Sequence, residues 1–417
     1  MEYVIKRDGA QVHFDREKIS EAIEKANLEV KELDGNYLEY SVICDIVEDV
    51  ISRCNEKEGD ISVEDIQNIV ELVLMSYEPD VARAYIRYRY MKEVAREYKA
   101  DFFEAIGDKL AAKNVANQNA NVDEHSFGGR VGEASDTMMK EYALNFCMSK
   151  MARENHLNNQ IYIHDLSAYA VGMHNCLTVP FDHLLEKGFN TRQVDIRPAN
   201  SVDTAFQLVA VIFQLQSLMQ FGGVSASHID WTMVPYVRKS FYKHYKDGLK
   251  YIIKNGEQKS AHYSSDLPID AYQYLRGDPK VYNYAMDMTK KELSQAAEGL
   301  YHNLNSLQSR SGNQLPFTSL NYGTCTLPEG RMVIKALLEG SIKGVGKHHR
   351  TPIFPCGIFQ VGEGINKYKG DPNYDLFQLA LKSTSLRLYP NYANIDWSGN
   401  AGYDKNDPKT YFSTMGK

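Results

Sequence analysis

The hydrophobic positions of the first hundred residues follow two different periods. Two short β-type runs, at residues 3–6 and 11–14, flank Asp8-Gly9, a dipeptide that tolerates the positive φ angles of a tight hairpin turn. Apolar residues then recur at helical spacing in four stretches: Ile19, Ala22, Ile23 and Ala26; Ile43, Ile46, Val47, Val50 and Ile51; Ile66, Ile69, Val70, Val73 and Leu74; and Val81, Ala84, Tyr85 and Tyr88. The pattern predicts a β-hairpin packed on four helices, a complete small domain over residues 1–95.

Polar residues between these stretches predict where the helices begin. Asp15 is placed to cap the first helix. Ser62 and Asp65 have the spacing of a capping box, in which each side chain accepts a hydrogen bond from the backbone N–H of the other residue. Pro79 stands where the fourth helix would open.

Beyond residue 95 the pattern changes. Residues 93–113 predict a helical connector, and the Asn- and Gly-rich stretch 114–136 is interpreted as a linker, with a nucleotide-contacting loop as the alternative. The chain then divides into a domain over 1–95, a connector and loop over 96–136, and a domain over 137–417. Within the last, helices are predicted over 138–155, 204–220, 229–251, 286–309 and 374–386, and strands over 160–163, 315–320 and 353–361. Strands that alternate with helices are typical of the α/β class.

Composition and charge mainly exclude classes of function. The net charge of −7 argues against general binding to nucleic acid or to an acidic membrane, so a phosphate site would have to be local. No apolar run reaches transmembrane length and the N-terminus is no signal peptide, so we expect a cytoplasmic location. Six cysteines without a C-x-x-C pair argue against a zinc ribbon or a disulfide framework, and no metal site is expected in this chain.

Several pieces of the first domain occur together and in order. They are VIKRDG at 4–9, FD at 14–15, KISEAI at 18–23, DIQNIVE at 65–71 and ARAYIRYR at 82–89. This set resembles the ATP-cone, a regulatory domain with a β-hairpin and a four-helix bundle. The resemblance implies ATP or dATP as an allosteric effector. It would be bound by Val4, Lys6, Arg7, Lys18, Val63, Gln67 and Arg89.

The basic residues at the front of this domain fit an anionic ligand on chemical grounds. Lys6 and Arg7 lie at a hairpin end, and Lys18 lies in the first turn of the next helix. A cation at a helix N-terminus is unfavourable by a few tenths of a kcal/mol, which a bound anion would offset. Lys6 and Arg7 by themselves favour a solvated charged hairpin, and the complete pattern reverses this preference in favour of a triphosphate.

The remaining sequence carries a second ordered set of motifs. They are FGGRVGE at 127–133, IYIHDL at 161–166, NCL at 175–177, QFGG at 220–223, SRSGNQLPF at 309–317, RTPIFP at 350–355, RLYP at 387–390 and STMG at 413–416. This set resembles the catalytic domain of anaerobic (class III, glycyl-radical) ribonucleotide reductases. The resemblance implies part of a ten-stranded α/β barrel and radical reduction of ribonucleoside triphosphates to deoxyribonucleoside triphosphates.

Two residues carry the catalytic implication. Cys176 matches the family's active-site cysteine on the first barrel strand, which takes part in the reduction step; a buried structural thiol is the alternative. Met415 matches a methionine that lines the substrate pocket just before the family's radical cysteine. Lys417 stands at the position of that cysteine, and neither the zinc-binding C-x-x-C pairs nor a glycyl-radical motif is present. We therefore expect a truncated portion that is inactive alone, with the glycyl radical and zinc in a C-terminal part that this sequence lacks.

Other residues have two open interpretations. His164 and Asp165 either cap a strand end or take part in catalysis, and Arg350 lies in a solvated loop or contacts phosphate. Gln207 and Gln214, in an apolar helix, either bind the base of a specificity effector or form interhelical hydrogen bonds. The resemblance implies a radical-SAM activating protein and a second copy of the chain as partners. The alternative function is a non-catalytic ATP/dATP sensor with an inert barrel remnant.

Overall fold

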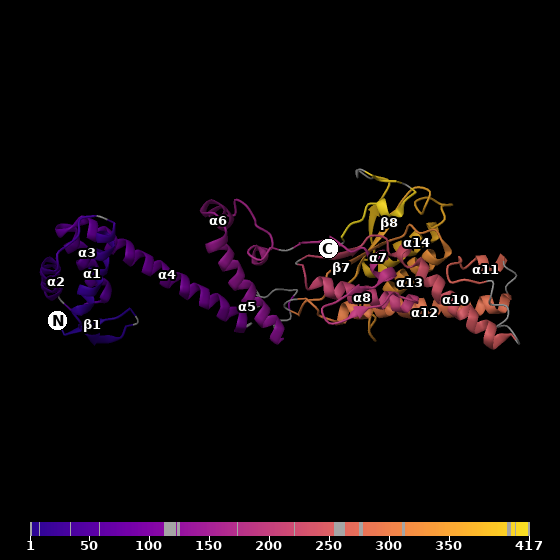
Figure 1. Ribbon diagram of the computed structural model, residues 1–417, viewed down its shortest axis with the longest axis horizontal. Helices are drawn as coiled ribbons and strands as arrows, with labels where there is room; N and C mark the ends of the chain where they lie inside the picture. Colours follow the sequence, from indigo (N-terminus) through magenta and orange to yellow (C-terminus); the bar gives the residue numbers. More distant parts are fainter. Residues whose placement is uncertain are drawn as a thin grey trace. The chain divides into compact units, whose positions relative to one another are not determined.

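The computed structural model describes residues 2–7, 9–33, 35–57, 59–111, 122, 126–172, 174–220, 222–253, 263–274, 278–310, 313–397, 402–404 and 406–415. The chain forms two compact units, Met1–Ala105 and Ile106–Lys417, each with its own hydrophobic core (Figure 1). None of the helices in the described ranges is both long and apolar enough to cross a membrane.

The first unit is the hairpin on four helices that the hydrophobic pattern predicts. Strands β1 (Tyr3–Ile5) and β2 (Gln11–His13) pair antiparallel, with Val4 opposite Val12. Gly9 has a φ of +81°, as the predicted turn requires, while Asp8 lies outside the described residues. The four helices are α1 (Glu17–Glu32), α2 (Tyr40–Asn55), α3 (Val63–Tyr77) and α4 (Pro79–Ala111).

The helix starts in this unit also follow the sequence. The backbone N–H of Asp65 donates to Ser62 Oγ at 3.1 Å, and the N–H of Ser62 donates to Asp65 Oδ2 at 3.0 Å, which confirms the capping box. Hydrogen bonds from Lys57 and Ser62 lower the pKa of Asp65 to about 2. The Asp15 carboxylate accepts a hydrogen bond from the N–H of Glu17 at the start of α1.

The predicted loop over 114–136 is wrong in its second half. Residues 112–121 and 123–125 lie outside the described residues, but α5 (Phe127–Tyr142) begins directly after Ser126, whose hydroxyl accepts a hydrogen bond from the N–H of Gly129. Gly128 serves close packing, because a Cβ there would lie 2.5 Å from the Asn313 side chain.

Two more predictions near this segment are wrong. The helix expected over 138–155 is interrupted: a π-helical turn (Ala143–Cys147) follows α5, and α6 (Lys150–Leu157) starts anew after the cap Ser149. No strand forms over 160–163, where Tyr162 is 79% exposed. The residues that flank this stretch, Asn159 and Asp165, have positive φ angles, which are incompatible with an extended ladder.

The second unit is built on a five-stranded parallel sheet whose strands lie in sequence order. The strands are β3 (Leu177–Thr178), β6 (Val224–Ala226), β7 (Thr318–Tyr322), β8 (Cys356–Val361) and β9 (Asn391–Asn394). A separate ribbon joins β4 (Phe189–Asn190) to β5 (Asp195–Ile196). The mixed α/β class is confirmed, and the strands expected over 315–320 and 353–361 are β7 and β8.

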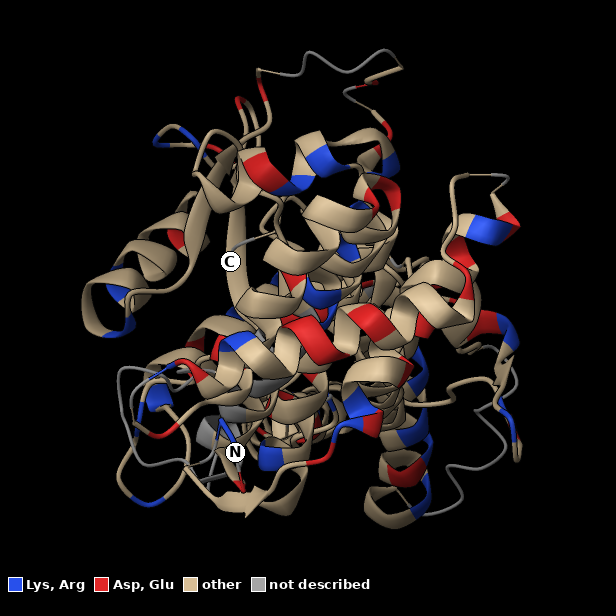
Figure 2. Ribbon diagram, turned by 90° about the vertical axis from the view of Figure 1, so that its left-hand side faces the viewer, with Lys and Arg blue, Asp and Glu red and all other residues tan. Residues whose placement is uncertain are grey.

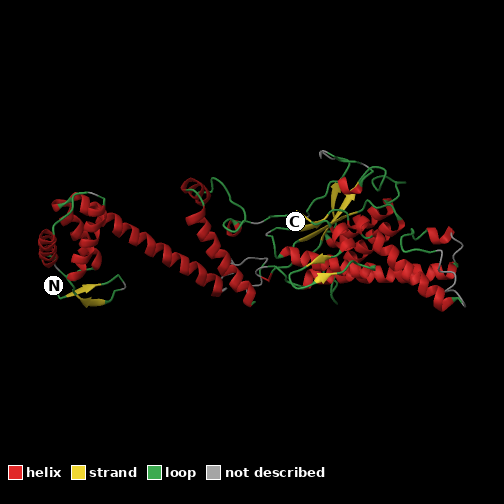
Figure 3. Cartoon of the chain, viewed as in Figure 1, coloured by secondary structure: helices red, strands yellow, loops and turns green. Residues whose placement is uncertain are grey.

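Helices cover one face of this sheet (Figure 3). The predicted long helices are present, while α13 and three of the five strands were not anticipated. The helices are α7 (Phe181–Lys187), α8 (Val202–Ser217), α9 (Ile229–Thr232), α10 (Val234–Ile252), α11 (Ala271–Tyr274), α12 (Pro279–Ser306), α13 (Pro328–Lys343) and α14 (Tyr374–Arg387).

The two faces of the sheet differ in chemistry because successive strand residues point to opposite sides. Val224, Leu320 and Phe359 belong to the main hydrophobic core beside the helices. Their neighbours in sequence, Ser225 and Asn321, are equally buried but polar and lie on the opposite face. This polar face is where the chemistry of the second unit is concentrated.

Replacement of Ser62 by alanine tests the capping box. We expect α3 to lose about 1 kcal/mol of local stability, because an orphan N–H at the helix start loses its acceptor. Native-state hydrogen exchange on the intact chain would show protection factors in α3 falling about fivefold. Ser126→Ala, which removes a comparable serine cap in the other unit, is the matched control and should leave exchange in α3 unchanged. Unchanged exchange in α3 of the Ser62→Ala variant would contradict the assignment of the capping box.

Candidate functional site

A pocket of ≈ 170 Å³ opens in the first unit between the hairpin, α1 and α3. Five of the seven residues predicted to bind ATP line it: Val4, Lys6, Lys18, Val63 and Gln67. The sequence analysis missed the other lining residues, which are Val12, His13, Phe14, Asp15, Ile19, Ala22, Ile66, Val70 and Tyr85. Most of these carry the apolar pattern of the domain, so nothing in the sequence separates them from ordinary core positions.

The pocket combines an apolar floor with a basic rim. Val4 and Tyr85 are buried in the domain core, and burial raises the pKa of Tyr85 to about 12, so its phenol stays protonated at neutral pH. Lys18 is exposed and its ammonium lies 3.4 Å from the Asp15 carboxylate. Along the helices, Lys and Arg are interspersed with Asp and Glu (Figure 2). At this pocket, by contrast, Lys6 and Lys18 lie beside an apolar floor, a combination that suits an aromatic base bearing an anionic group.

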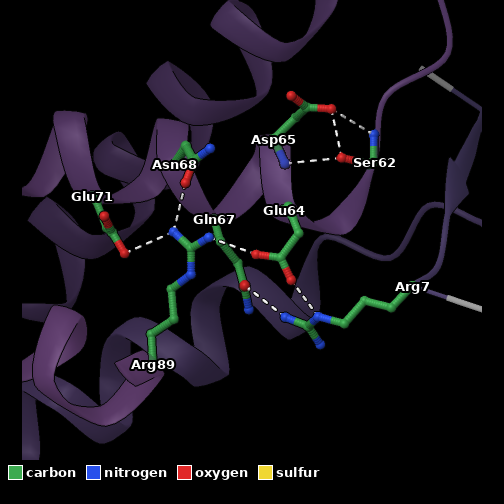
Figure 4. A network of polar contacts seen from close by, with 8 residues as sticks. All are labelled: Arg7, Ser62, Glu64, Asp65, Gln67, Asn68, Glu71 and Arg89. Atoms are coloured by element: carbon green, nitrogen blue, oxygen red, sulfur yellow. Dashed lines mark hydrogen bonds and ion pairs between the residues drawn. The ribbon is translucent and has the colours of Figure 1, made fainter. Parts of the chain in front are cut away.

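The other two predicted residues, Arg7 and Arg89, do not line this pocket. Figure 4 shows them joined by the carboxylate of Glu64, which forms ion pairs with both. Arg7 also donates to the Gln67 side chain at 2.8 Å, and Arg89 contacts Glu71 at 2.8 Å and Asn68 at 2.7 Å. Gln67 thus connects the pocket to this network. Glu64 was missed, because an acid in the first turn of a helix is already explained by the helix dipole.

In the second unit, buried amides on the polar face of the sheet hold a distant segment of backbone. Asn321 donates to the Thr414 carbonyl at 3.0 Å and accepts from the Thr414 N–H at 3.1 Å, and Gln360 donates to the Phe412 carbonyl at 2.8 Å. The Asn321 amide therefore pairs with Thr414 much as a peptide group in a ladder would. This pairing brings Met415, directly after Thr414, to the polar face, while Gly416 and Lys417 lie outside the described residues.

Cys176 directly precedes β3 and lies two residues before Thr178, which pairs in register with Ser225. It is therefore on the same side of the sheet as Ser225 and Asn321. Its side chain is exposed, so the interpretation as a buried structural thiol is wrong. The N–H of Gly223 donates to the sulfur at 3.4 Å. Gly222 must be glycine, because a Cβ there would lie 2.0 Å from the Asn175 carbonyl oxygen.

Arg310 supplies a positive charge beside this cysteine. It is buried, donates to the Gly222 carbonyl at 3.0 Å and stacks on the Phe317 ring with its guanidinium carbon 4.2 Å from the ring centre. Burial lowers the pKa of Arg310, and electrostatic attraction to nearby acidic groups, first of all the Asp165 carboxylate, opposes that shift. A fixed guanidinium close to the thiol and to a carboxylate suits a polar or anionic substrate.

A larger pocket, ≈ 530 Å³, lies next to Arg310. It is lined by α5, the 162–171 segment and the end of α8. Residues from four motifs of the sequence meet there, since Glu133, Asp165, Gln220 and Gln314 all face it. Asp165 therefore lines a pocket. No strand ends at this residue, so the interpretation of Asp165 as a strand cap is wrong.

The structure does not unite the remaining candidates with these sites. Gln207 is exposed on α8, and the Gln214 amide nitrogen is buried without a hydrogen-bond partner in the described structure, so the interhelical hydrogen bonds considered for them are not formed. Cys325 and Cys356 are buried, and burial raises the pKa of both thiols, as is typical of structural cysteines. Arg350 lies in an exposed turn, as the solvated-loop interpretation expects.

Comparison with known proteins decides the family. Residues 118–416 match the family model described as anaerobic ribonucleoside-triphosphate reductase, and residues 2–94 match the ATP cone domain. This chain belongs to the anaerobic ribonucleoside-triphosphate reductase family. The resemblance seen in the two sets of motifs is thereby confirmed, and the first unit of this reductase-family chain is an ATP-cone domain.

Its relatives agree. The chain is 32% identical to the anaerobic ribonucleoside-triphosphate reductase of Haemophilus influenzae over 397 residues, which are 94% of this chain and 52% of that protein. It is 30% identical to the enzyme of Escherichia coli over 399 residues, 94% and 51% of the two chains. The chain thus spans about half the length of these curated relatives. The anaerobic ribonucleotide reductase of Thermotoga maritima, solved with dATP and CTP, aligns over 74% of this chain and 50% of that chain with 16% identity and a TM-score of 0.46.

Thiol alkylation tests the placement of Cys176. We expect iodoacetamide to modify the exposed Cys176 and Cys147 in the native chain at least about tenfold faster than Cys325 or Cys356, whose burial shields the sulfur and raises the thiol pKa. Mass spectrometry of peptides from timed reactions gives each rate. Protection of Cys176 to the level of Cys356 would show that it is not on an accessible face.

Proposed function

We propose that this chain forms the nucleotide-sensing unit and the first catalytic portion of an enzyme that reduces ribonucleoside triphosphates to deoxyribonucleoside triphosphates without oxygen. One observation carries the proposal: an accessible thiol, Cys176, lies on a buried polar sheet face to which Asn321 ties the segment that carries Met415. Membership of the reductase family supports the assignment of this face to the ribonucleotide.

The chemistry requires a shielded site with a hydrogen donor. Replacement of the ribose 2′-hydroxyl by hydrogen is a two-electron reduction that proceeds through radical steps. The hydroxyl takes up a proton and leaves as water, a thiol delivers a hydrogen atom to the 2′-carbon, and an external reductant, formate or a thiol protein, supplies the electrons that restore the thiol. Cys176 would hold that hydrogen at its sulfur, oriented by the N–H of Gly223. Arg310 and Asp165, which line the pocket of ≈ 530 Å³, would bind and orient polar groups of the substrate. Met415 would line the substrate site, as the family resemblance implies. The glycyl radical and the zinc site of the family are proposed for segments outside these 417 residues.

The ATP-cone would bind ATP or dATP as an allosteric effector. The pocket of ≈ 170 Å³ is smaller than sites that enclose a whole ligand, so it suits the base, with the phosphates extending over Lys6 and Lys18. The proposal includes regulation of the enzyme at this unit and its activation by a radical-SAM protein. It also includes assembly with a second copy of the chain and a cytoplasmic location.

The double variant Lys6→Ala/Lys18→Ala tests the nucleotide site. Each lysine that contacts a phosphate contributes a charge-assisted hydrogen bond worth about 1.5–3 kcal/mol, so we expect the affinity for ATP and dATP to fall at least about tenfold. Titration calorimetry on the intact chain measures it. Lys25→Ala is the matched control, because Lys25 pairs with Glu21 on α1 and does not line the pocket. Equal affinities in the wild type and the double variant would remove the phosphate role of these lysines.

A protection experiment tests the substrate site. We expect CTP at millimolar concentration to slow the alkylation of Cys176 several-fold, because a bound ribose would cover the thiol. Cys147, which is also exposed, serves as the internal control and should react at an unchanged rate. A chain that senses ATP but carries an inert sheet would show no effect of CTP on Cys176, and that outcome would favour the non-catalytic alternative.

A further inference from the structure

Glu64 lies between the two arginines that the ATP-cone pattern assigns to the nucleotide. One carboxylate oxygen pairs with Arg7, at the end of the hairpin, and the other pairs with Arg89 on α4 at 2.5 Å (Figure 4). Glu64 itself belongs to the first turn of α3, directly after the pocket residue Val63. A single side chain thus connects the hairpin, α3 and α4 beside the pocket.

The charges of the network balance within the protein itself. Arg89, whose side chain is 16% exposed, is also paired with Glu71, so two guanidinium groups face two carboxylates. Within the described part of the chain, Glu64 is the carboxylate that pairs with Arg7. Burial raises the pKa of Glu64, but hydrogen bonds and charge from Arg7 and Arg89 outweigh burial and lower it, so Glu64 is ionised at neutral pH.

The same network reaches the pocket through Gln67. This side chain lines the pocket and accepts a hydrogen bond from Arg7 at 2.8 Å. A phosphate chain that leaves the pocket past Gln67 therefore meets an arginine whose charge is already compensated by a carboxylate. Carboxylate and phosphate oxygens present the same acceptor geometry to a guanidinium, so the two compete for the same donors.

We propose that Glu64 is a built-in competitor for the phosphate groups of the bound nucleotide and that it sets how strongly the site responds to their number. This inference rests on the proposed nucleotide-binding function. A nucleotide with a long phosphate chain displaces Glu64 from Arg7, and one with a single phosphate leaves the ion pairs in place. The displacement is feasible because ion pairs between partly exposed side chains are weak.

The variant Glu64→Gln tests this role, since it keeps the size and hydrogen-bonding shape of the side chain and removes its charge. Titration of the intact chain with ATP should show binding about three- to tenfold tighter than in the wild type. AMP, whose single phosphate would not reach Arg7, should bind with less than about a twofold change, because the Glu64–Arg7 ion pair stays in place and neutralises the Glu64 charge. The ratio of the AMP to the ATP dissociation constant therefore rises.

Glu29→Gln is the matched control. Glu29 forms an ion pair with Arg87 between α1 and α4 of the same unit, its side chain is similarly exposed, and it does not line the pocket. This variant makes the same change in net charge, and we expect both dissociation constants to stay at their wild-type values. Thermal unfolding monitored by circular dichroism verifies that both variants are folded.

A double-variant cycle gives an independent measure. Arg7→Ala should weaken ATP binding more in the Glu64→Gln background than in the wild type, because Arg7 is then free to serve the phosphates. Equal or weaker ATP binding by Glu64→Gln, or equal gains for AMP and ATP, would overturn the inference. Titrations with and without Mg²⁺ give the reason for a weaker affinity. If Glu64→Gln binds ATP more weakly only when Mg²⁺ is present, Glu64 is a ligand of the metal ion and not a competitor of the phosphates. Failure of the wild type to bind ATP would instead overturn the nucleotide site.

Discussion

The alternation of side chains along the parallel strands is the constraint on which the second unit depends. Because the strand period is two residues, one face of the sheet can be apolar and packed against helices while the other stays polar. Leu320 and Phe359 face the helices, and Asn321 and Gln360, which follow them directly, are fully buried on the opposite side. A strand shifted by one residue would exchange the two faces and lose both the core and the site.

Buried amides on that face hydrogen-bond to the backbone at Phe412 and Thr414, although the Gln360 side-chain oxygen has no partner among the described residues. The Asn321 amide satisfies both backbone groups of Thr414, and Gln360 satisfies the carbonyl of Phe412. These bonds are made inside the protein, where the loss of a partner is costly. The sheet therefore holds Phe412 and Thr414 in place through contacts outside their own segment.

The first unit uses charge in a comparable way. Its hairpin brings Lys6 to an apolar pocket, while Arg7, the next residue, is directed into an ion-pair network with Glu64. Adjacent basic residues in the sequence thus have different environments, one open to a ligand and one neutralised by the protein. A ligand that engages both must rearrange the network, which gives the unit a means of converting binding into a structural change.

The sequence by itself determined the local elements and the family. The four helices of the first unit, the capping box at Ser62 and the long helices α8, α10, α12 and α14 follow from spacing within one segment, and the ordered motifs point to Cys176. Tertiary structure alone decided the short strands β3 and β6 and the helical start at Phe127. It also decided two long-range contacts, between Arg7 and Glu64, 57 residues apart, and between Asn321 and Thr414, 93 residues apart. The physical reason is that spacing reports which side of its own helix or strand a residue occupies. The partner that covers that side comes from a distant segment, through contacts that leave no periodic trace.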